Sequence, residues 1–296
     1  MVSLRTFALT TLAVAALSGA ASAADLLPPP PAPEAPYVVS ESSGWYLRGD
    51  VGVGINSNPS ASTSPDPTAG ILGATDAFYN PTMSESGIVD FGVGYQVNKW
   101  FRADVTAELR GGATFQGLEV CSNCTGAGNQ LSDFYRGNVS SYIGMLNGYV
   151  DLGTWSGFTP YVGAGVGVAY NKMSGMTDQG FNYVNTATTQ TGFPTGGYFG
   201  NGSSTNFAWA LMAGTSFDVT KNLKLELGYR YLDYGSVKSG NAHCLTGQAT
   251  PTFNCQGFTV KANRLAANDF HIGLRYYFDA PSAAPVVYDQ PLVRKY

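Results

Sequence analysis

The chain has 296 residues and a formal net charge of −4, and only 12% of its residues are charged. Soluble globular domains carry about twice this charged fraction. The sequence has no basic run with interleaved aromatic residues, which argues against a nucleic-acid partner. Abundant glycine and tyrosine with few charges are instead typical of the wall of a membrane-spanning β-barrel, where tyrosine lies at the membrane interfaces.

The first 23 residues have the three parts of a cleaved export signal. Met1 to Arg5 is a short basic region, residues 6–17 are apolar, and Ala21-Ser22-Ala23 is a cleavage site made of small residues. The apolar run is too short to cross a bilayer as a helix. We therefore expect a mature chain that begins at Ala24-Asp25.

Residues 24–43 are rich in proline, with the run LLPPPPAPEAPYVVSESS from Leu26 to Ser43. Proline has no N–H to donate to a β-ladder, so this segment is excluded from a barrel strand. It is predicted to be an extended, semi-rigid periplasmic linker.

Between residues 44 and 278, eight segments alternate apolar and polar residues, and each has the length of about ten residues that crosses a bilayer at a tilt. In the last of them, Phe270 to Phe278, even-numbered residues are apolar while His271 and Arg275 lie on the opposite face. This alternation is typical of a strand with lipid on one side and a polar interior on the other. The expected strands are 45–55, 87–97, 100–110, 139–152, 159–170, 206–219, 223–234 and 268–278.

The connections alternate strictly between long and short. Long loops are expected at 56–86, 111–137, 171–205 and 235–267, and short turns at 98–99, 153–157 and 220–222. Outer-membrane barrels have long extracellular loops and short periplasmic turns. The sequence therefore predicts an all-β, eight-stranded antiparallel transmembrane β-barrel with both ends, including a disordered tail at 279–296, in the periplasm. The alternative is a soluble, lipocalin-like barrel with its apolar face turned inward.

The polar face of these strands carries six bases against seven acids. Charges enclosed in so narrow a barrel must pair, so near-balance favours a salt-bridged plug over a selective channel. A narrow porin for small solutes is the alternative. The residues expected to face inward are Arg48, Asp50, Asp90, Arg102, Asp104, Glu108, Arg110, Asp151, Asp218, Lys224, Glu226, Arg230 and Arg275.

The four cysteines, Cys121, Cys124, Cys244 and Cys255, lie in turn-rich segments of an exported chain, which favours disulfides. Of the three possible connectivities, proximity in sequence favours 121–124 and 244–255. A redox site at Cys121–Cys124 would need a flanking strand and helix that the sequence lacks.

No catalytic constellation is found, so we expect neither an enzyme nor a cofactor. His243 and His271 have no nucleophile with a positioning carboxylate beside them. A metal site at His243, Cys244 and Cys255 is the alternative to the disulfide, but it would require a fourth ligand.

The segment Gly44-Trp45-Tyr46-Leu47-Arg48-Gly49 and the final strand resemble the eight-stranded outer-membrane β-barrel family of alphaproteobacteria, which is related to small surface-antigen barrels of the OmpA-transmembrane type. The resemblance covers residues 44–278. It implies that His271, Gly273, Tyr276 and Phe278 form the signal read by the barrel-assembly machinery. The chain departs from the family in continuing to Tyr296 beyond the last aromatic residue of the signal.

The resemblance also implies a peptidoglycan attachment. Some members of the family are linked through a mature N-terminal Ala-Asp to the diaminopimelate amine of peptidoglycan by an L,D-transpeptidase. Ala24 and Asp25 stand at the matching position, directly after the predicted cleavage site.

Three functions follow from these observations. The first is a non-enzymatic barrel in the outer membrane that contributes to envelope integrity, with the peptidoglycan tether as an anchor. The second is a narrow porin. The third is a surface adhesin or ligand-binding protein that acts through its four long loops, since loops often carry function.

Overall fold

The computed structural model describes residues 44–278 apart from 125, 186–189 and 245–256. Within these residues no helix is long and apolar enough to cross a membrane. Eight long strands carry the fold: β1 (Gly44–Asn56), β4 (Ser86–Gln96), β5 (Phe101–Ser122), β6 (Gln130–Asp151), β7 (Phe158–Asn185), β9 (Gly202–Asp218), β10 (Leu223–Lys238) and β12 (Thr259–Tyr277). Four shorter strands are β2 (Ser60–Ser64), β3 (Thr75–Met83), β8 (Gln190–Phe199) and β11 (Ala242–Cys244).

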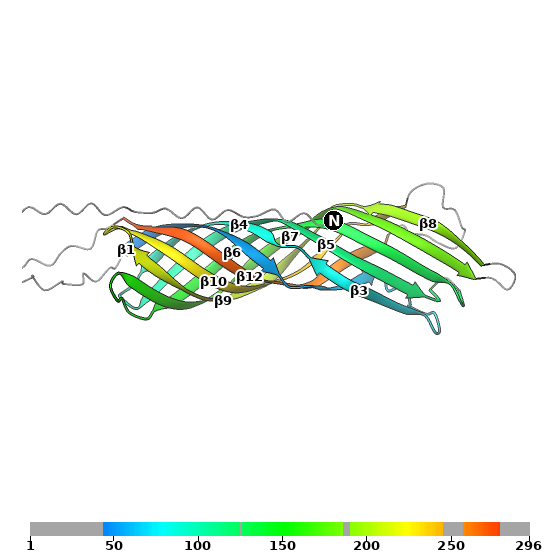
Figure 1. Cartoon of the computed structure of the whole chain (residues 1–296), viewed down its shortest axis with the longest axis horizontal. Coiled ribbons are helices and arrows are strands. Elements are labelled where there is room, and N and C mark those ends of the chain that lie inside the picture. Colours follow the sequence, from blue (N-terminus) through cyan, green and yellow to red (C-terminus); the bar gives the residue numbers. More distant parts are fainter. Residues whose placement is uncertain (1–43, 125, 186–189, 245–256, 279–296) are drawn as a thin grey trace, which may run out of the picture. The chain divides into compact units, whose positions relative to one another are not determined.

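The eight long strands close into a ring. Each pairs antiparallel with its neighbour in the series, and the last strand, β12, pairs with the first, β1, from Tyr46 opposite Tyr277 to Asn56 opposite Ala267. Figure 1 shows these tilted strands running around the barrel. A closed ring leaves no open edge in the lipid. The predicted eight-stranded antiparallel barrel is therefore confirmed.

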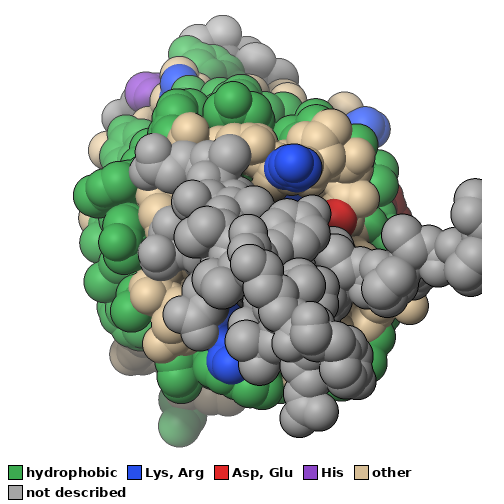
Figure 2. All heavy atoms as spheres, turned by 90° about the vertical axis from the view of Figure 1, so that its left-hand side faces the viewer, with side chains coloured by type: hydrophobic (Ala, Val, Ile, Leu, Met, Phe, Trp, Pro, Cys, Tyr) green, Lys and Arg blue, Asp and Glu red, His purple; other side chains and the backbone are tan. Residues whose placement is uncertain are grey.

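The two faces of the wall differ as the alternation predicts. Along Phe101 to Arg110 of β5, every odd-numbered residue is exposed and every even-numbered residue is buried. The exposed positions are apolar, including Val105 at 61% and Leu109 at 53%, and the buried ones are polar or charged. Seen from the left-hand end of Figure 1, hydrophobic side chains line much of the perimeter (Figure 2).

Aromatic side chains lie at both ends of this lipid-facing wall, as interfacial girdles do in outer-membrane barrels. Trp45, Tyr95, Trp100, Trp155, Phe217 and Phe278 lie near the short turns, and Tyr142, Tyr170, Phe207, Trp209, Tyr229 and Phe270 lie at the other end. All of them are exposed.

The segments predicted as long loops are largely β-structure, which corrects the expected strand ends. Strands β5 and β6 stay paired from Ala113 opposite Val139 up to Ser122 opposite Gln130, and β7 continues to Asn185 and pairs with β8. Strand β3 pairs with β5, and β2 pairs with β12. We call these short strands, together with the parts of β5, β6, β7, β10 and β12 beyond the lipid-facing wall, the extension.

A change of parity explains why the alternation did not reveal the extension. The β5–β6 register shifts between Arg110 and Ala113, and Gly112 in this bulge has a φ of +82°, a conformation that favours glycine. Beyond the bulge the inward positions become odd-numbered, and Ala113 and Phe115 are buried while Gln116 faces outward. The apolar face is therefore inside the extension and outside in the membrane.

The extension has an apolar core of its own. The side chains of Phe115, Val139, Met173, Met176, Leu232 and Val260 are each no more than 3% exposed and belong to one cluster. These residues lie on strands β5, β6, β7, β10 and β12, so the cluster fills the interior of the extension.

Candidate functional site: barrel interior and extension

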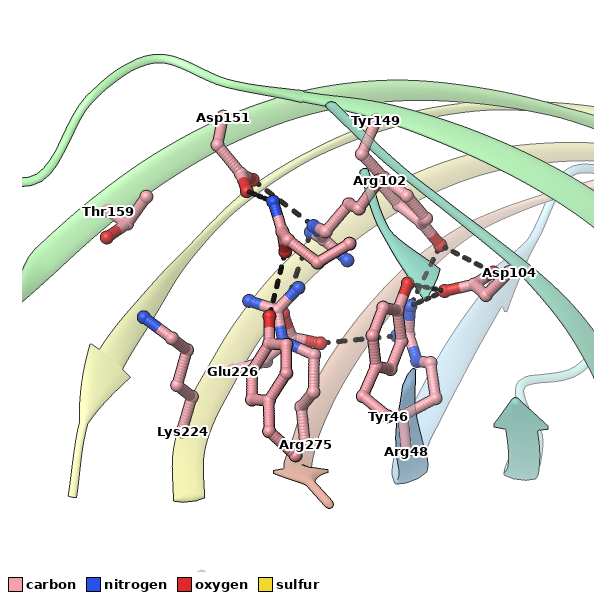
Figure 3. A network of polar contacts seen from close by, with 12 residues as sticks. Tyr46, Arg48, Arg102, Asp104, Tyr149, Asp151, Thr159, Lys224, Glu226 and Arg275 are labelled. Atoms are coloured by element: carbon pink, nitrogen blue, oxygen red, sulfur yellow. Dashed lines mark hydrogen bonds and ion pairs between the residues drawn. The ribbon is translucent and has the colours of Figure 1, made fainter. Parts of the chain in front are cut away.

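Tyr46 and Arg48 of β1 begin a network of polar contacts across the barrel interior (Figure 3). The Arg48 Nε donates to Asp50 Oδ2 at 2.8 Å, and its Nη1 lies 3.2 Å from Asp104 Oδ2. The Tyr46 hydroxyl donates to the same Asp104 oxygen at 3.1 Å, and the Tyr149 hydroxyl accepts from Arg48 at 2.8 Å. The contacts link β1, β5 and β6, so they span the interior from wall to wall.

Glu226 of β10 lies among three arginines. Its carboxylate is 3.0 Å from Arg275 Nη2, 3.6 Å from Arg102 Nη2 and 3.7 Å from Arg48 Nη2. The Arg102 guanidinium also lies over the ring of Tyr149, 3.9 Å from its centroid. This stacking holds the Arg102 side chain across the barrel.

A second charged network lies nearer the extension. Arg110 contacts Glu108 at 2.9 Å and Asp269 at 2.6 Å, and Arg230 contacts the same two carboxylates. Asp269 is fully buried and was missing from the predicted interior set. The alternation held the signal, because a lipid-facing Phe270 places Asp269 inward.

The structure brings together the charges predicted to face inward, except for Lys224 and Asp218. Eleven of the thirteen side chains are enclosed by the barrel: Arg48, Asp50, Asp90, Arg102, Asp104, Glu108, Arg110, Asp151, Glu226, Arg230 and Arg275. Lys224 is half-buried. Asp218 instead lies at the exposed end of β9, where it accepts from Lys224 Nζ at 2.5 Å.

Little free volume is left around these networks. A cavity of about 20 Å³ is lined by Asp90, Arg230 and His271 among others, which is room for about one water. The Nε2 atom of His271 has no hydrogen-bond partner within the described part of the chain. The interior therefore has the character of a filled polar core.

The extension turns inward four carboxylates that sequence reasoning assigned to loops: Glu119 is buried, and the other three are half-buried. Glu119 accepts from the Tyr135 hydroxyl at 2.6 Å and the Thr63 hydroxyl at 2.8 Å, and it lies opposite Asp133 in the β5–β6 register. Asp76 of β3 and Asp178 of β7 face the same interior. We call Asp76, Glu119, Asp133 and Asp178 the acidic layer.

Burial and mutual repulsion raise the pKa of these carboxyls. Desolvation, followed by the charge of Asp178, raises the pKa of Asp133 to about 7, and desolvation, followed by the charge of Glu119, raises the pKa of Asp178 to about 7. The pKa of Glu119 is raised chiefly by burial. Among the described residues no group of three or more His, Cys, Asp or Glu has the geometry of a metal site.

Comparison with known proteins decides the family. Residues 9–278 match the outer membrane protein beta-barrel domain. The chain belongs to this family. It is 35% identical to an uncharacterised protein of Brucella suis over 283 residues, which cover 88% of this chain and 93% of the relative. It is 27% identical to the outer membrane protein PagN of Salmonella typhimurium, covering 81% of this chain and 92% of PagN.

Two further similarities complete the comparison. A candidate adhesin of Rickettsia felis is 28% identical over 212 residues, which cover 69% of this chain and 79% of that protein. Among solved structures, Neisserial surface protein A matches with 16% identity and a TM-score of 0.39, covering 80% of this chain and 98% of that structure.

Family membership and the lipid-facing wall place this barrel in the outer membrane, as the sequence predicts. The short turns are then periplasmic, and the extension is extracellular.

One predicted disulfide is confirmed. Cys121 and Cys124 are bonded, with a Cα–Cα distance of 5.8 Å, at the tip of the β5–β6 hairpin. Cys255 and the side chain of Cys244 lie outside the described residues, as do the export signal, the proline-rich segment with Ala24 and Asp25, and residues 279–296.

The residues of the predicted assembly signal lie on both faces of β12. Tyr276 and Phe278 point outward at the periplasmic end with ring centroids 6.0 Å apart. His271 and Gly273 point inward, and a Cβ added to Gly273 would lie 2.6 Å from Asp50 Cγ. The absence of a side chain at Gly273 therefore leaves the space that Asp50 occupies. Recognition of the four signal residues by the assembly machinery stays a prediction.

Proposed function

We propose that this protein is a non-enzymatic, non-conducting outer-membrane barrel whose extension presents a rigid binding surface to the cell's surroundings. The observation that carries the proposal is the continuation of β5, β6 and β7 beyond the lipid-facing wall as a paired sheet with its own apolar core. The membrane-spanning part of the barrel closes without this sheet, so the extension calls for a function of its own.

Two layers fill the path that a solute would take. The charged networks around Glu226 and around Asp269 occupy the membrane-spanning interior. The apolar cluster around Phe115 and Met173 fills the interior of the extension. An eight-stranded barrel has room for side chains and little else, so these layers disfavour the porin alternative.

The tip of the extension has the properties of a preorganised binding surface. Backbone pairing holds the β5–β6 hairpin to its last residues, and the Cys121–Cys124 disulfide fixes the tip. A rigid surface loses less conformational entropy when it binds a partner. The similarity to a candidate adhesin of Rickettsia felis supports this role.

The contribution to envelope integrity and the peptidoglycan tether form a separate proposal, which rests on Ala24 and Asp25 directly after the export signal. Mass spectrometry of protein released by muramidase tests the tether. A muropeptide adduct on Ala24 is expected, and a free Ala24 amine throughout the sample would reject the tether.

Adherence of cells tests the binding role. A non-adherent Gram-negative host displaying the full chain should adhere to epithelial cells or matrix at least tenfold better than the empty host. The matched variant replaces residues 118–134 by Asn-Gly between Gly117 and Tyr135, which are opposite in the register, so that Phe115 and Tyr135 stay in place. This variant should lose the gain while keeping the heat-sensitive gel migration of a folded barrel. Equal adherence of the full chain and the empty host would contradict the proposal.

A further inference from the structure

Charge is sorted between the two faces of β3, β5, β6 and β7 within the extension. The acidic residues that β3, β5, β6 and β7 carry beyond the membrane are those of the acidic layer, and all four share the inward face. The outward face of the same described segments carries Arg136 of β6 and Lys172 of β7, and no aspartate or glutamate. Because the whole chain has a net charge of −4, this outward excess of bases is not a consequence of composition.

Both outward bases lack a counter-ion in the part of the chain that the structure describes. Arg136 and Lys172 are exposed, and among the described residues neither side chain forms an ion pair. On the other side of the barrel, Lys238 of β10 lies directly opposite Lys261 of β12, and Asp233 of β10 is also on the outward face. Like charges opposite one another in a sheet are destabilising, so an anion between such residues would stabilise the extension.

Exposed aromatic rings accompany these bases on the same outward face. Tyr79 is 56% exposed, Phe134 40%, Phe181 51% and Tyr198 53%. Tyr79 and Phe134 flank Leu118 in one row across β3, β5 and β6. Beside the rings, the same face also carries Gln116, Ser132 and Gln179. Flat rings among small polar groups suit the apolar faces and hydroxyls of sugar rings.

The outward face continues the lipid-facing wall, and this continuity identifies its neighbour. Lys172 lies two residues beyond the girdle residue Tyr170 and Arg136 six residues before Tyr142, which is about 7 Å and about 20 Å along the strands. The face looks sideways, along the membrane plane, whereas the tip of the β5–β6 hairpin is the part that another cell would meet first. What stands beside it are the phosphorylated saccharides of the outer-leaflet lipids.

We propose that the outward face of the extension binds the phosphorylated saccharide of lipopolysaccharide in the same outer leaflet. Arg136 and Lys172 bind its phosphates, since guanidinium and ammonium groups are the usual phosphate partners in proteins. The rings of Tyr79, Phe134 and Phe181 stack on its sugars. The lipid would then brace the extension from the side, independently of any partner bound at the tip.

Binding of purified lipopolysaccharide to the full chain in detergent tests the proposal, with the shift in melting temperature and native mass spectrometry as readouts. The double substitution Arg136→Gln, Lys172→Gln should weaken binding at least tenfold. The matched control, Lys99→Gln with Lys221→Gln, removes two exposed lysines next to the periplasmic turns and should change binding less than twofold. Chemically dephosphorylated lipopolysaccharide should bind the wild type no better than intact lipopolysaccharide binds the double variant.

A second variant tests the rings. Phe134→Ser with Phe181→Ser keeps both bases and should weaken binding of intact lipopolysaccharide while leaving binding of lipid A without core sugars unchanged. Equal binding by the wild type and the Arg136/Lys172 variant would overturn the proposal. So would a wild-type chain that forms dimers through this face and shows no response to lipopolysaccharide. Failure of the full chain to confer adherence, with lipopolysaccharide binding intact, would count against the proposed function and not against this surface.

Discussion

Arg110 of β5 and Asp269 of β12 are separated by 159 residues of sequence, and yet Arg110 Nη2 donates to Asp269 Oδ2 at 2.6 Å. The contact crosses the barrel interior below the extension. Asp269 also accepts from Arg230 at 2.8 Å, so this carboxylate compensates two buried arginines. Its removal would leave Arg110 and Arg230 sharing Glu108 alone.

We expect Asp269→Ala to lower the free energy of unfolding by about 3–5 kcal/mol, the range found when one partner of a buried ion pair is removed. Urea unfolding of the barrel in detergent, followed by heat-sensitive gel migration, measures the change. Asp218→Ala is the matched control, because Asp218 pairs with Lys224 at the exposed end of β9 and such pairs contribute about 0–1 kcal/mol. Equal effects of the two substitutions would contradict the picture of a buried network.

The barrel could be predicted from the sequence because every strand within the membrane must place apolar side chains toward lipid and polar side chains toward the interior. Val105 and Leu109 must face outward, and Arg102 and Glu108 must face inward, over a length that the bilayer sets. The closing pair of β1 and β12 and the interior ion pairs followed from that rule. Which arginine meets which acid did not, because pairing partners such as Arg110 and Asp269 depend on strand tilt and register.

The extension could not be predicted from the same rule. Its outward face is in water, so Gln116 replaces an apolar residue there, and the Gly111-Gly112 bulge moves Phe115 to the inside. A glycine pair followed by polar residues has the composition of a loop. The one available signal was the alternation of Ala113, Phe115, Gly117 and Glu119 in the new parity, which becomes visible only when the bulge is known.

Stability of the extension should fall as the pH rises. The pKa of Asp133 and of Asp178 is raised to about 7, whereas an unfolded aspartate titrates near pH 4. Between about pH 4 and pH 7 the folded chain binds more protons than the unfolded chain, so the free energy of unfolding decreases with pH through this window. Hydrogen-exchange protection of the β5–β6 hairpin, corrected for the intrinsic dependence of amide exchange on pH, should therefore be lower at pH 8 than at pH 5.

The substitution Asp133→Asn should flatten this dependence, because it removes a proton that only the folded extension retains and relieves repulsion of Asp178. Asp218→Asn, at the exposed end of β9 beside a short turn, serves as the control and should leave the dependence unchanged. Equal or higher protection at pH 8 than at pH 5 in the wild type would contradict the raised pKa values.

Planar-bilayer recording should show no steady conductance steps for the wild type. The charged networks fill the interior without help from the extension, so loosening the apolar cluster with Phe115→Ser and Met173→Ser should also leave the barrel closed. Steps in the double variant alone would assign the seal to the apolar cluster around Phe115. Steady, sizeable steps in the wild type would favour the porin alternative.

The space beside Gly273 should contribute to the stability of the closed barrel. A methyl group at this position would meet the Asp50 side chain, which is itself held by Arg48. We expect Gly273→Ala to destabilise the refolded barrel by about 1–3 kcal/mol, the usual effect of overpacking. Gly144→Ala is the control, because Gly144 is in a strand with nothing within 4 Å of an added Cβ. Refolding into detergent separates this packing effect from recognition by the assembly machinery: a variant with wild-type stability in detergent that fails to assemble in cells would assign Gly273 to the assembly signal.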